Sequence, residues 1–306
     1  MNLENDFKGL VSEMVACVAA ENPMHKKNLE VALARISAEE SEQLGRYIAY
    51  CINSGLSIPY LVESYLTLVY DTLKEQIYFQ KHGKYRHSCY EDVANDVYLN
   101  EQYMAKYMYG LAVALYLWPG LLEIYRFFSR TLPRDKRGRY LEVGPGPGTN
   151  MMFAMQMTSY DSFYGIDISE TSIKMTKSII EYSLPRARAA YELEQNDFLS
   201  AAPPRDKYAC IVMGEVLEHV EQPSLFLRKI TEMARDDAFI FVTTCINTPA
   251  IDHIYLFEST EQVAQMIRDS GLRIQNELVL PYEGMSLENC MKERLPVNVA
   301  YVLAKQ

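Results

Sequence analysis

The sequence predicts an α/β fold, in which a mainly parallel sheet covered by helices follows an all-helical region. From residue 139 onward, short apolar runs alternate with amphipathic stretches, which is typical of strands that alternate with helices. Residues 1 to about 128 instead carry apolar side chains at three- and four-residue intervals, the spacing of helices. A glycine-rich stretch, "YLEVGPGPGTN" at 140–150, follows the first apolar run. We therefore expect a helical lid over 1–133 and a sheet domain over 134–306.

Long helices are expected in the first part. In chain order they read "LVSEMVACVAA", "KNLEVALARI", "AEESEQLGRYIAYCINSG" and "SIPYLVESYLTLVYDTLKEQIYF". A further helix should begin near Asn100 and place Tyr103, Tyr107, Leu111 and Ala114 along one face. Tyrosines are dense here, at positions 85, 90, 98, 103, 107, 109 and 116. Because a buried phenol needs a hydrogen-bond partner, these rings either fill a core or form a pocket wall.

Seven apolar runs predict the strands of the sheet. They are "RYLEVG", "SFYGID", "ARAAYELEQND", "YACIVMG", "FIFVTTC", "LRIQNELVL" and "VNVAYVLAK". Strands that helices cover on both faces read as such apolar runs, which favours a mainly parallel sheet. The basic stretch "RTLPRDKRGR" at 130–139 contains Pro133 and Gly138, and we interpret it as a solvated linker between the two parts.

Composition narrows the class of protein. Hydrophobic residues make up 49% and charged residues 23% of the 306, as in a soluble globular protein. The longest apolar stretch, from Gly110, is interrupted by Pro119 and is too short to span a bilayer, so no membrane partner is expected. The start, "MNLENDFKGL", lacks the basic and apolar segments of a secretory signal. We expect a cytoplasmic protein.

The charge and the cysteines bear on partners and metals. A net charge of −10 disfavours nucleic acid, whose phosphates need cationic side chains, so the substrate should be a small molecule. The six cysteines form no C-x-x-C pair and no zinc-like cluster with histidine, so we predict reduced thiols and no metal site. No pattern in the sequence specifies an oligomeric state.

The glycines at 144, 146 and 148 predict a site where a ligand presses against the backbone. A turn between a strand and a helix presents N–H groups to a ligand that a Cβ would exclude. The nicotinamide dinucleotide pattern G-x-G-x-x-G is an alternative, but Thr149 stands where its third glycine belongs. The fit to that pattern is partial.

Polar residues follow the next strands at their carboxyl ends. Asp167 ends "YGIDIS", where a carboxylate can accept both hydroxyls of a ribose. "QNDFL" offers Asp197 to an exocyclic amine and Phe198 as an apolar face for a purine. The fourth run leads into "GEVLEHV", with Glu215, Glu218 and His219; the last of these either caps a helix start or takes part directly.

In this order, the four segments closely resemble those of the class I S-adenosylmethionine-dependent methyltransferases, a Rossmann-like family. The resemblance spans about residues 139–305 and implies that 134–306 binds S-adenosylmethionine. The glycines would lie under the methionine part of the cofactor, with Glu142 near its ammonium group. The resemblance implies that Asp167 and Ile168 bind ribose and adenine, that Asn196, Asp197 and Phe198 hold adenine, and that Gly214 or Glu215 faces the sulfonium.

Three activities stay open at this level. In methyl transfer to a small metabolite, Tyr98, Tyr103 or Tyr107 would shape the pocket, while Asp252 or His253 in "CINTPAIDHIYLF" takes a proton. No metal is required for this chemistry. In the second, the cofactor cyclises to azetidine-2-carboxylate and methylthioadenosine, with tyrosine faces around the sulfonium; "NDVYLNEQYMAKYMYG" resembles the enzymes that do this. The third is a cofactor-binding scaffold without catalysis.

Overall fold

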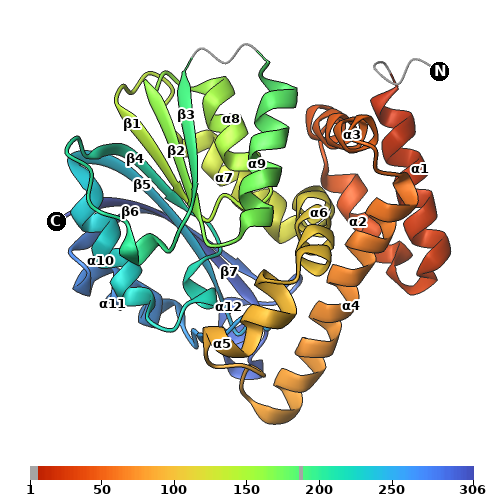
Figure 1. Ribbon diagram of the computed structural model, residues 1–306. Helices are drawn as coiled ribbons and strands as arrows, with labels where there is room; N and C mark the ends of the chain where they lie inside the picture. The colour runs from red at the N-terminus through yellow and green to blue at the C-terminus, as the bar shows by residue number, and fades with distance from the viewer. Residues whose placement is uncertain (1–5, 186–188) are drawn as a thin grey trace.

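The computed structural model describes residues 6–185 and 189–306. Figure 1 shows a twisted sheet flanked by helices, with the first helices, in red and orange, gathered at one side. The helical part begins with α1 (Phe7–Glu21), the short η1 (Pro23–His25), α2 (Lys26–Arg35), α3 (Ala38–Asn53) and α4 (Ile58–His82). The predicted helices are thereby confirmed.

Local sequence explains where these helices start and stop. The Ser37 hydroxyl accepts the backbone N–H of Glu40, whose carboxylate accepts the N–H of Ser37, so a capping box opens α3. Ser57 caps α4, which ends at Gly83 in the left-handed conformation, φ 70°. These caps satisfy backbone groups that a helix end leaves without partners.

The chain between α4 and the sheet carries most of the dense tyrosines. Here α5 (Tyr90–Val93) runs into a π-helical turn, η2 (Ala94–Tyr98), before α6 (Glu101–Leu117). Asn100 caps α6 by accepting the N–H of Tyr103 at 3.1 Å, which confirms the helix expected from that point. Pro119 opens α7 (Pro119–Thr131) directly after it.

The sheet has seven strands among the described residues, in the order β3-β2-β1-β4-β5-β7-β6. The strands are β1 (Arg139–Val143), β2 (Ser162–Asp167), β3 (Ala190–Gln195), β4 (Tyr208–Met213), β5 (Ala234–Ile246), β6 (Leu272–Pro281) and β7 (Val297–Lys305). Neighbours from β3 to β5 pair in parallel, whereas β7 is antiparallel to both β5 and β6. The predicted mainly parallel, seven-stranded sheet is confirmed.

Two strand bounds differ from the apolar runs that predicted them. Strand β5 begins five residues before Phe239, because its exposed, charged start still pairs with β4, Ala234 lying opposite Tyr208. Of the third run, residues 187 and 188 lie outside the described residues, and β3 begins at Ala190.

Helices cover both faces of the sheet (Figure 1). On one face lie α7, α8 (Thr149–Met157) and α9 (Glu170–Ser183), with Phe128 of α7 packing on Phe241 of β5 at 5.1 Å between ring centroids. On the other lie α10 (Pro223–Met233) and α11 (Thr260–Asp269). The remaining elements are η3 (Phe198–Ser200), η4 (Leu217–His219) and α12 (Leu287–Glu293).

The helical part is fastened to the sheet part by polar contacts. The Arg126 guanidinium of α7 contacts both carboxylate oxygens of Glu40 on α3, at 2.7 and 2.6 Å. The Tyr50 hydroxyl donates to Ser178 Oγ on α9 at 2.9 Å. Because α7 belongs both to the predicted lid and to the cover of the sheet, the division at 133/134 stays a prediction.

A membrane-spanning helix was not expected from the sequence. Among the described residues, no single helix is both long and apolar enough to cross a bilayer; α6 and α7 meet that test only as a pair, and they are bent by 80°.

Candidate active site

The glycine loop after β1 can be built only with glycine. Gly144, Gly146 and Gly148 have φ of 67°, 54° and 80°, which side chains rarely adopt. A Cβ on Gly144 would come within 2.7 Å of Val216, and one on Gly148 within 2.8 Å of the Thr176 backbone. The loop therefore turns tightly, and Gly144 and Gly146 line a cavity.

A buried and a half-buried carboxylate lie at the tips of β1 and β2. Glu142 is 2% exposed and accepts the Tyr140 hydroxyl at 2.5 Å. Burial raises the pKa of Glu142 to about 8, although that hydrogen bond lowers it. Asp167 accepts the N–H groups of Ser169 at 2.8 Å and Gly146 at 3.3 Å. Burial raises the pKa of Asp167 to about 6 against these bonds.

The residues predicted to hold adenine lie at the tips of β2 and β3. Ile168 is 43% exposed beside Asp167, and Phe198 is buried against Phe226 with 5.6 Å between ring centroids. Both oxygens of Asp197 accept local donors, the N–H of Leu199 at 3.0 Å and the Ser200 hydroxyl at 2.8 Å. Asn196 donates to Glu194 at 2.8 Å.

The turn after β4 holds Glu215 in a conformation that favours glycine, with φ 52°. Its N–H donates to the Thr243 hydroxyl at 3.0 Å, and that hydroxyl donates to the Glu215 carboxylate at 2.6 Å. Burial and the neighbouring Glu218 raise the pKa of Glu215 well above its ordinary value. Strain and desolvation together make this turn a candidate functional position.

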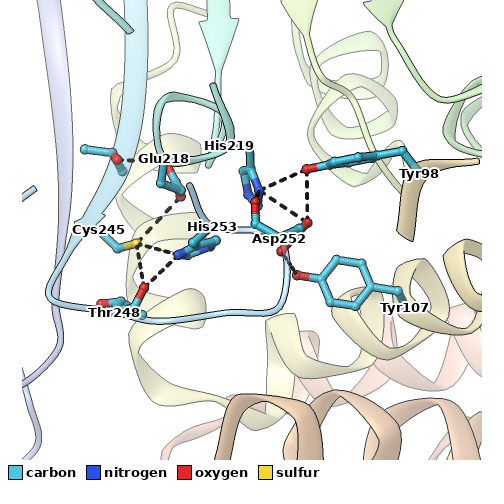
Figure 2. Close-up of polar contacts among 9 residues, drawn as sticks. Tyr98, Tyr107, Glu218, His219, Cys245, Thr248, Asp252 and His253 are labelled. Atoms are coloured by element: carbon cyan, nitrogen blue, oxygen red, sulfur yellow. Dashed lines mark hydrogen bonds and ion pairs between the residues drawn. The ribbon is translucent and has the colours of Figure 1, made fainter. Parts of the chain in front are cut away.

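Asp252 lies at the centre of a polar cluster (Figure 2), which we call the Asp252 cluster: Tyr98, Tyr107, His219 and Asp252. The tyrosine hydroxyls donate to its carboxylate at 3.2 and 3.1 Å. His219 Nδ1 lies 3.2 Å from the same carboxylate. Figure 2 shows both tyrosines pointing from the helical part toward this carboxylate, which lies in the loop after β5.

The Asp252 cluster holds a buried pair of opposite charges. Burial acts to raise the pKa of Asp252, but the charge and hydrogen bond of His219 hold it well below its ordinary range. Burial likewise opposes the charged form of His219, yet Asp252 raises the pKa of His219 to about 9. At neutral pH the cluster is therefore an ion pair with two phenol donors.

His253 lies behind this pair. Its Nδ1 is 2.7 Å from the Thr248 carbonyl and its ring stands edge-on to His219, with 4.7 Å between centroids. Burial and the charge on His219 lower the pKa of His253. Because a carbonyl only accepts, Nδ1 carries the proton, and the neutral ring keeps a lone pair on Nε2.

Tyr103 is not brought into this cluster. Its hydroxyl donates to Asp71 on α4 at 2.7 Å, and it is absent from the described residues that line the cavity. His219, for which the sequence left a capping role open, lines the cavity, and so does Tyr90, a residue that sequence reasoning missed and whose ring stacks on Tyr98 at 5.6 Å between centroids. The density of tyrosines between residues 85 and 116 was the sequence feature that could have pointed to Tyr90.

Apart from Gly148 and Tyr103, the predicted site residues border a cavity of about 1310 Å³ along the carboxyl edge of the sheet. We call its wall at the tips of β1 to β4 the cofactor half: Glu142–Pro147, Asp167, Ile168, Asn196–Phe198 and Gly214–Val216. Its far half is lined by α2, α4, α6, α7, the end of β6 and the start of β7. Since β5 lies between β4 and β7 in the sheet, Asp252 stands between the two halves.

Side chains of the types that bind metals also gather at the wall of the cavity and directly behind it. Glu218, His219 and His253 form one group whose ligand atoms lie within 4.8 Å of one another, and Glu215, Glu218 and Cys245 form another. Internal partners already engage them, since Glu218 accepts the Thr244 hydroxyl at 2.7 Å. That no metal is needed stays a prediction.

Comparison with known proteins identifies the class. A family model described as a methyltransferase domain matches residues 120–294, more than half of the chain. The chain therefore belongs to the class I S-adenosylmethionine-dependent methyltransferases, as the four motifs predicted. No curated protein matches the chain in sequence.

Solved structures share the Rossmann-like fold. The mitomycin 7-O-methyltransferase MmcR is 12% identical with a TM-score of 0.54, covering 78% of this chain and 68% of its own. A chain from the complex between the Haloferax volcanii Trm112 methyltransferase activator and a methyltransferase is 11% identical, with a TM-score of 0.51. The match covers 68% of this chain and 97% of that chain. At these identities the likeness concerns the fold.

The cofactor half fits S-adenosylmethionine by its own chemistry. The loop leaves a backbone surface where a Cβ would intrude, and two desolvated carboxylates with raised pKa face a cavity that a cationic, hydroxyl-bearing ligand would complement. Glu142 would meet the ammonium group and Asp167 the ribose hydroxyls.

Proposed function

We propose that this protein transfers a methyl group from S-adenosylmethionine to a small molecule. The observation that carries the proposal is the cavity itself. Its volume of about 1310 Å³ exceeds the roughly 300–1,000 Å³ of a typical ligand pocket, and it continues past Asp252 into the far half. A second molecule would occupy that half.

The chain's own residues would orient the acceptor and remove a proton. The bound cofactor supplies an electrophilic methyl group. Asp252, held ionised by His219, accepts a hydrogen bond from the acceptor in place of Tyr98 or Tyr107 and so aligns it. Neutral His253 takes the acceptor's proton as the new bond to carbon forms and the carbon–sulfur bond breaks.

Cyclisation of the cofactor to azetidine-2-carboxylate and methylthioadenosine is the second candidate. Tyrosine rings favour it: Tyr90, Tyr98 and Tyr107 line the cavity beside the Asp252 carboxylate, and aromatic faces with an anion stabilise a sulfonium. In this reaction the cofactor's own amine would be the nucleophile, and the far half would have no substrate to hold.

The products separate the two candidates. The protein is incubated with S-adenosylmethionine alone and then with a panel of small acceptors, and the products are identified by mass spectrometry. Methyl transfer gives S-adenosylhomocysteine only when an acceptor is present. Methylthioadenosine from the cofactor alone, above the uncatalysed background, would establish cyclisation instead.

Tyrosine variants sharpen the same test. If a hydroxyl positions the acceptor, Tyr107→Phe lowers kcat about as much as Tyr107→Ala; if the ring face matters, phenylalanine retains most activity. Tyr103→Phe is the matched control, since it removes a hydroxyl one turn away that contacts Asp71. Equal losses at 103 and 107 would contradict a specific role for the Asp252 cluster.

A further inference from the structure

The far half of the cavity has walls that are mostly apolar. Helices α2 and α4 contribute Val31, Leu68 and Leu73, and α6 and α7 contribute Leu115 and Leu121. Pro281 closes the wall where β6 ends. These side chains come from both the helical part and the sheet part, and the cavity they line continues from the cofactor half. A ligand that fills it has an apolar body.

Large apolar side chains also gather at the rim of this half. Met24, Leu73 and Tyr282 border the cavity, yet they are 90%, 54% and 53% exposed. Single exposed apolar residues are ordinary, but three around one cavity form an apolar rim. Arg35 of α2 and Glu283 form an ion pair across the same rim.

Among its described residues, the far half offers a ligand no cation without a partner. Its carboxylates, Glu123 and Glu283, pair with Arg126 and Arg35, and His219, at the border with the cofactor half, pairs with Asp252. Within residues 6–185 and 189–306, the wall contains no lysine and a single arginine, Arg35, which Glu283 already pairs. The imidazole of His25 adds no cation, because burial lowers its pKa.

An anionic ligand would lose its water in this half without gaining a cationic partner, and a desolvated charge without a partner is costly. A carboxylate or phosphate is therefore disfavoured, whereas an amine, a hydroxyl or a phenol is not. Asp252 further favours a hydrogen-bond donor at the reacting end.

We propose that the far half takes an apolar molecule without an anionic group, which enters between Met24, Leu73 and Tyr282. The inference rests on the proposed methyl transfer for its assignment as the acceptor. It excludes nucleotides, phosphate-bearing carriers and free fatty acids as acceptors. It admits an apolar amine or alcohol, whose polar end reaches Asp252.

Matched probes test the charge preference. 4-Phenylbutylamine, 4-phenylbutanol and 4-phenylbutanoate share one apolar body and differ in the end group. Binding to the full chain is measured by ligand-observed NMR with saturating S-adenosylhomocysteine. We expect the amine and the alcohol to bind and the carboxylate to bind at least tenfold more weakly. Equal affinity for the carboxylate, or binding of none of the probes, overturns the proposal.

A charge added at the rim tests where the ligand enters. Leu73→Lys places a cation beside the cavity, and Ile77→Lys places one a turn further along α4, at a residue 62% exposed and outside the lining. Leu73→Lys should strengthen 4-phenylbutanoate binding about fivefold and weaken the amine. If Ile77→Lys has the same effect, the assignment of the rim is wrong.

Cofactor binding is measured separately from binding of the probes. Binding of S-adenosylhomocysteine is measured by calorimetry for each variant, and we expect it to stay unchanged. If the probes behave as expected but the chain does not bind the nucleoside, the proposed methyl transfer fails while the far half keeps its charge preference. If the nucleoside binds and the carboxylate probe binds as well as the amine, only the further inference fails.

Discussion

The two halves of the cavity are built from different parts of the chain. In the cofactor half, the wall is backbone and short strand tips: the loop through Gly144 and Gly148 leaves no room for a side chain, and Asp167 is held by two N–H groups. In the far half, the wall is made of side chains from four helices and two strands, such as Leu73 and Leu121. Backbone conformation therefore determines the shape of the cofactor half, and side-chain packing determines the shape of the far half.

This difference predicts how each half responds to substitution. A change in the cofactor half alters backbone geometry or a desolvated charge, so it should affect binding strongly. A change in the far half alters the shape of an apolar wall, where related side chains of similar volume substitute at low cost. Substitutions in each half test that contrast.

Gly146→Val should lower affinity for S-adenosylmethionine more than about 100-fold. The residue needs φ 54°, and a branched side chain there would occupy the backbone surface that faces the ligand. Gly55→Val is the matched control, because Gly55 also has positive φ, 91°, but no neighbour within 4 Å. Calorimetric titration of both variants checks the prediction. Equal loss at both sites would mean that strain alone explains the effect.

Asp167→Ala should weaken cofactor binding by about 2 kcal/mol, since two ribose hydroxyls lose a charged acceptor. The variant should stay folded, because the side-chain hydrogen bonds it loses are those to the N–H groups of Ser169 and Gly146, and no ion pair is broken among the described residues. Leu121→Ala in the far half should leave cofactor affinity within about 0.5 kcal/mol. An unchanged affinity in folded Asp167→Ala would remove the ribose role.

Glu142→Gln should stabilise the protein by about 1–3 kcal/mol while weakening cofactor binding. The pKa of Glu142 is about 8 in the folded chain against 4.5 ordinarily, so the folded state retains a proton that the unfolded state has lost between these values. Stability therefore falls as pH rises through that window, and glutamine removes the fall. Urea unfolding of both proteins at pH 5 and pH 8 measures the difference in their free energies of unfolding. An equal stabilisation at both pH values would contradict the raised pKa of Glu142 as its cause.

Cofactor should slow hydrogen exchange of residues 85–98 by a small factor. This segment has only α5 and a π-helical turn, and it carries Tyr90 and Tyr98 to the cavity. Amides of α6 should change less, since that helix already packs against α4 and α9. Mass-spectrometric exchange with and without S-adenosylhomocysteine checks this. If the exchange rates of residues 85–98 are identical with and without the ligand, the segment does not respond to cofactor binding.

The cofactor half was predictable from sequence because its residues are local. Gly144 follows β1, Asp167 ends β2 and Asp197 comes two residues after β3, so the order of strands and the parallel sheet suffice to bring them to one edge. The fold itself followed from the same runs. The start of β5 escaped, because Ala234 pairs with Tyr208 of β4 before an exposed, charged segment that carries no apolar pattern.

The Asp252 cluster was predictable only in part. Asp252 was proposed as a base from its place after β5, but its partner His219 comes from a turn after β4, and no local pattern links the two. Tyr103 and Tyr107 share a helix face, yet their hydroxyls reach different acids, Asp71 and Asp252. The far half forms only where four helices and two strands meet, and no single segment encodes that meeting.

The position of β7 in the sheet has a consequence for synthesis of the chain. Strand β6 is hydrogen-bonded only to β7, and one edge of β5 is paired with β7 alone, although β7 follows both in the sequence. As a ribosome delivers the chain from its N-terminus, β1 to β5 can assemble first. The apolar edge of β5 then waits uncovered until residues 297–305 emerge. That interval, rather than the finished molecule, is when this protein is most exposed to aggregation and most in need of a chaperone.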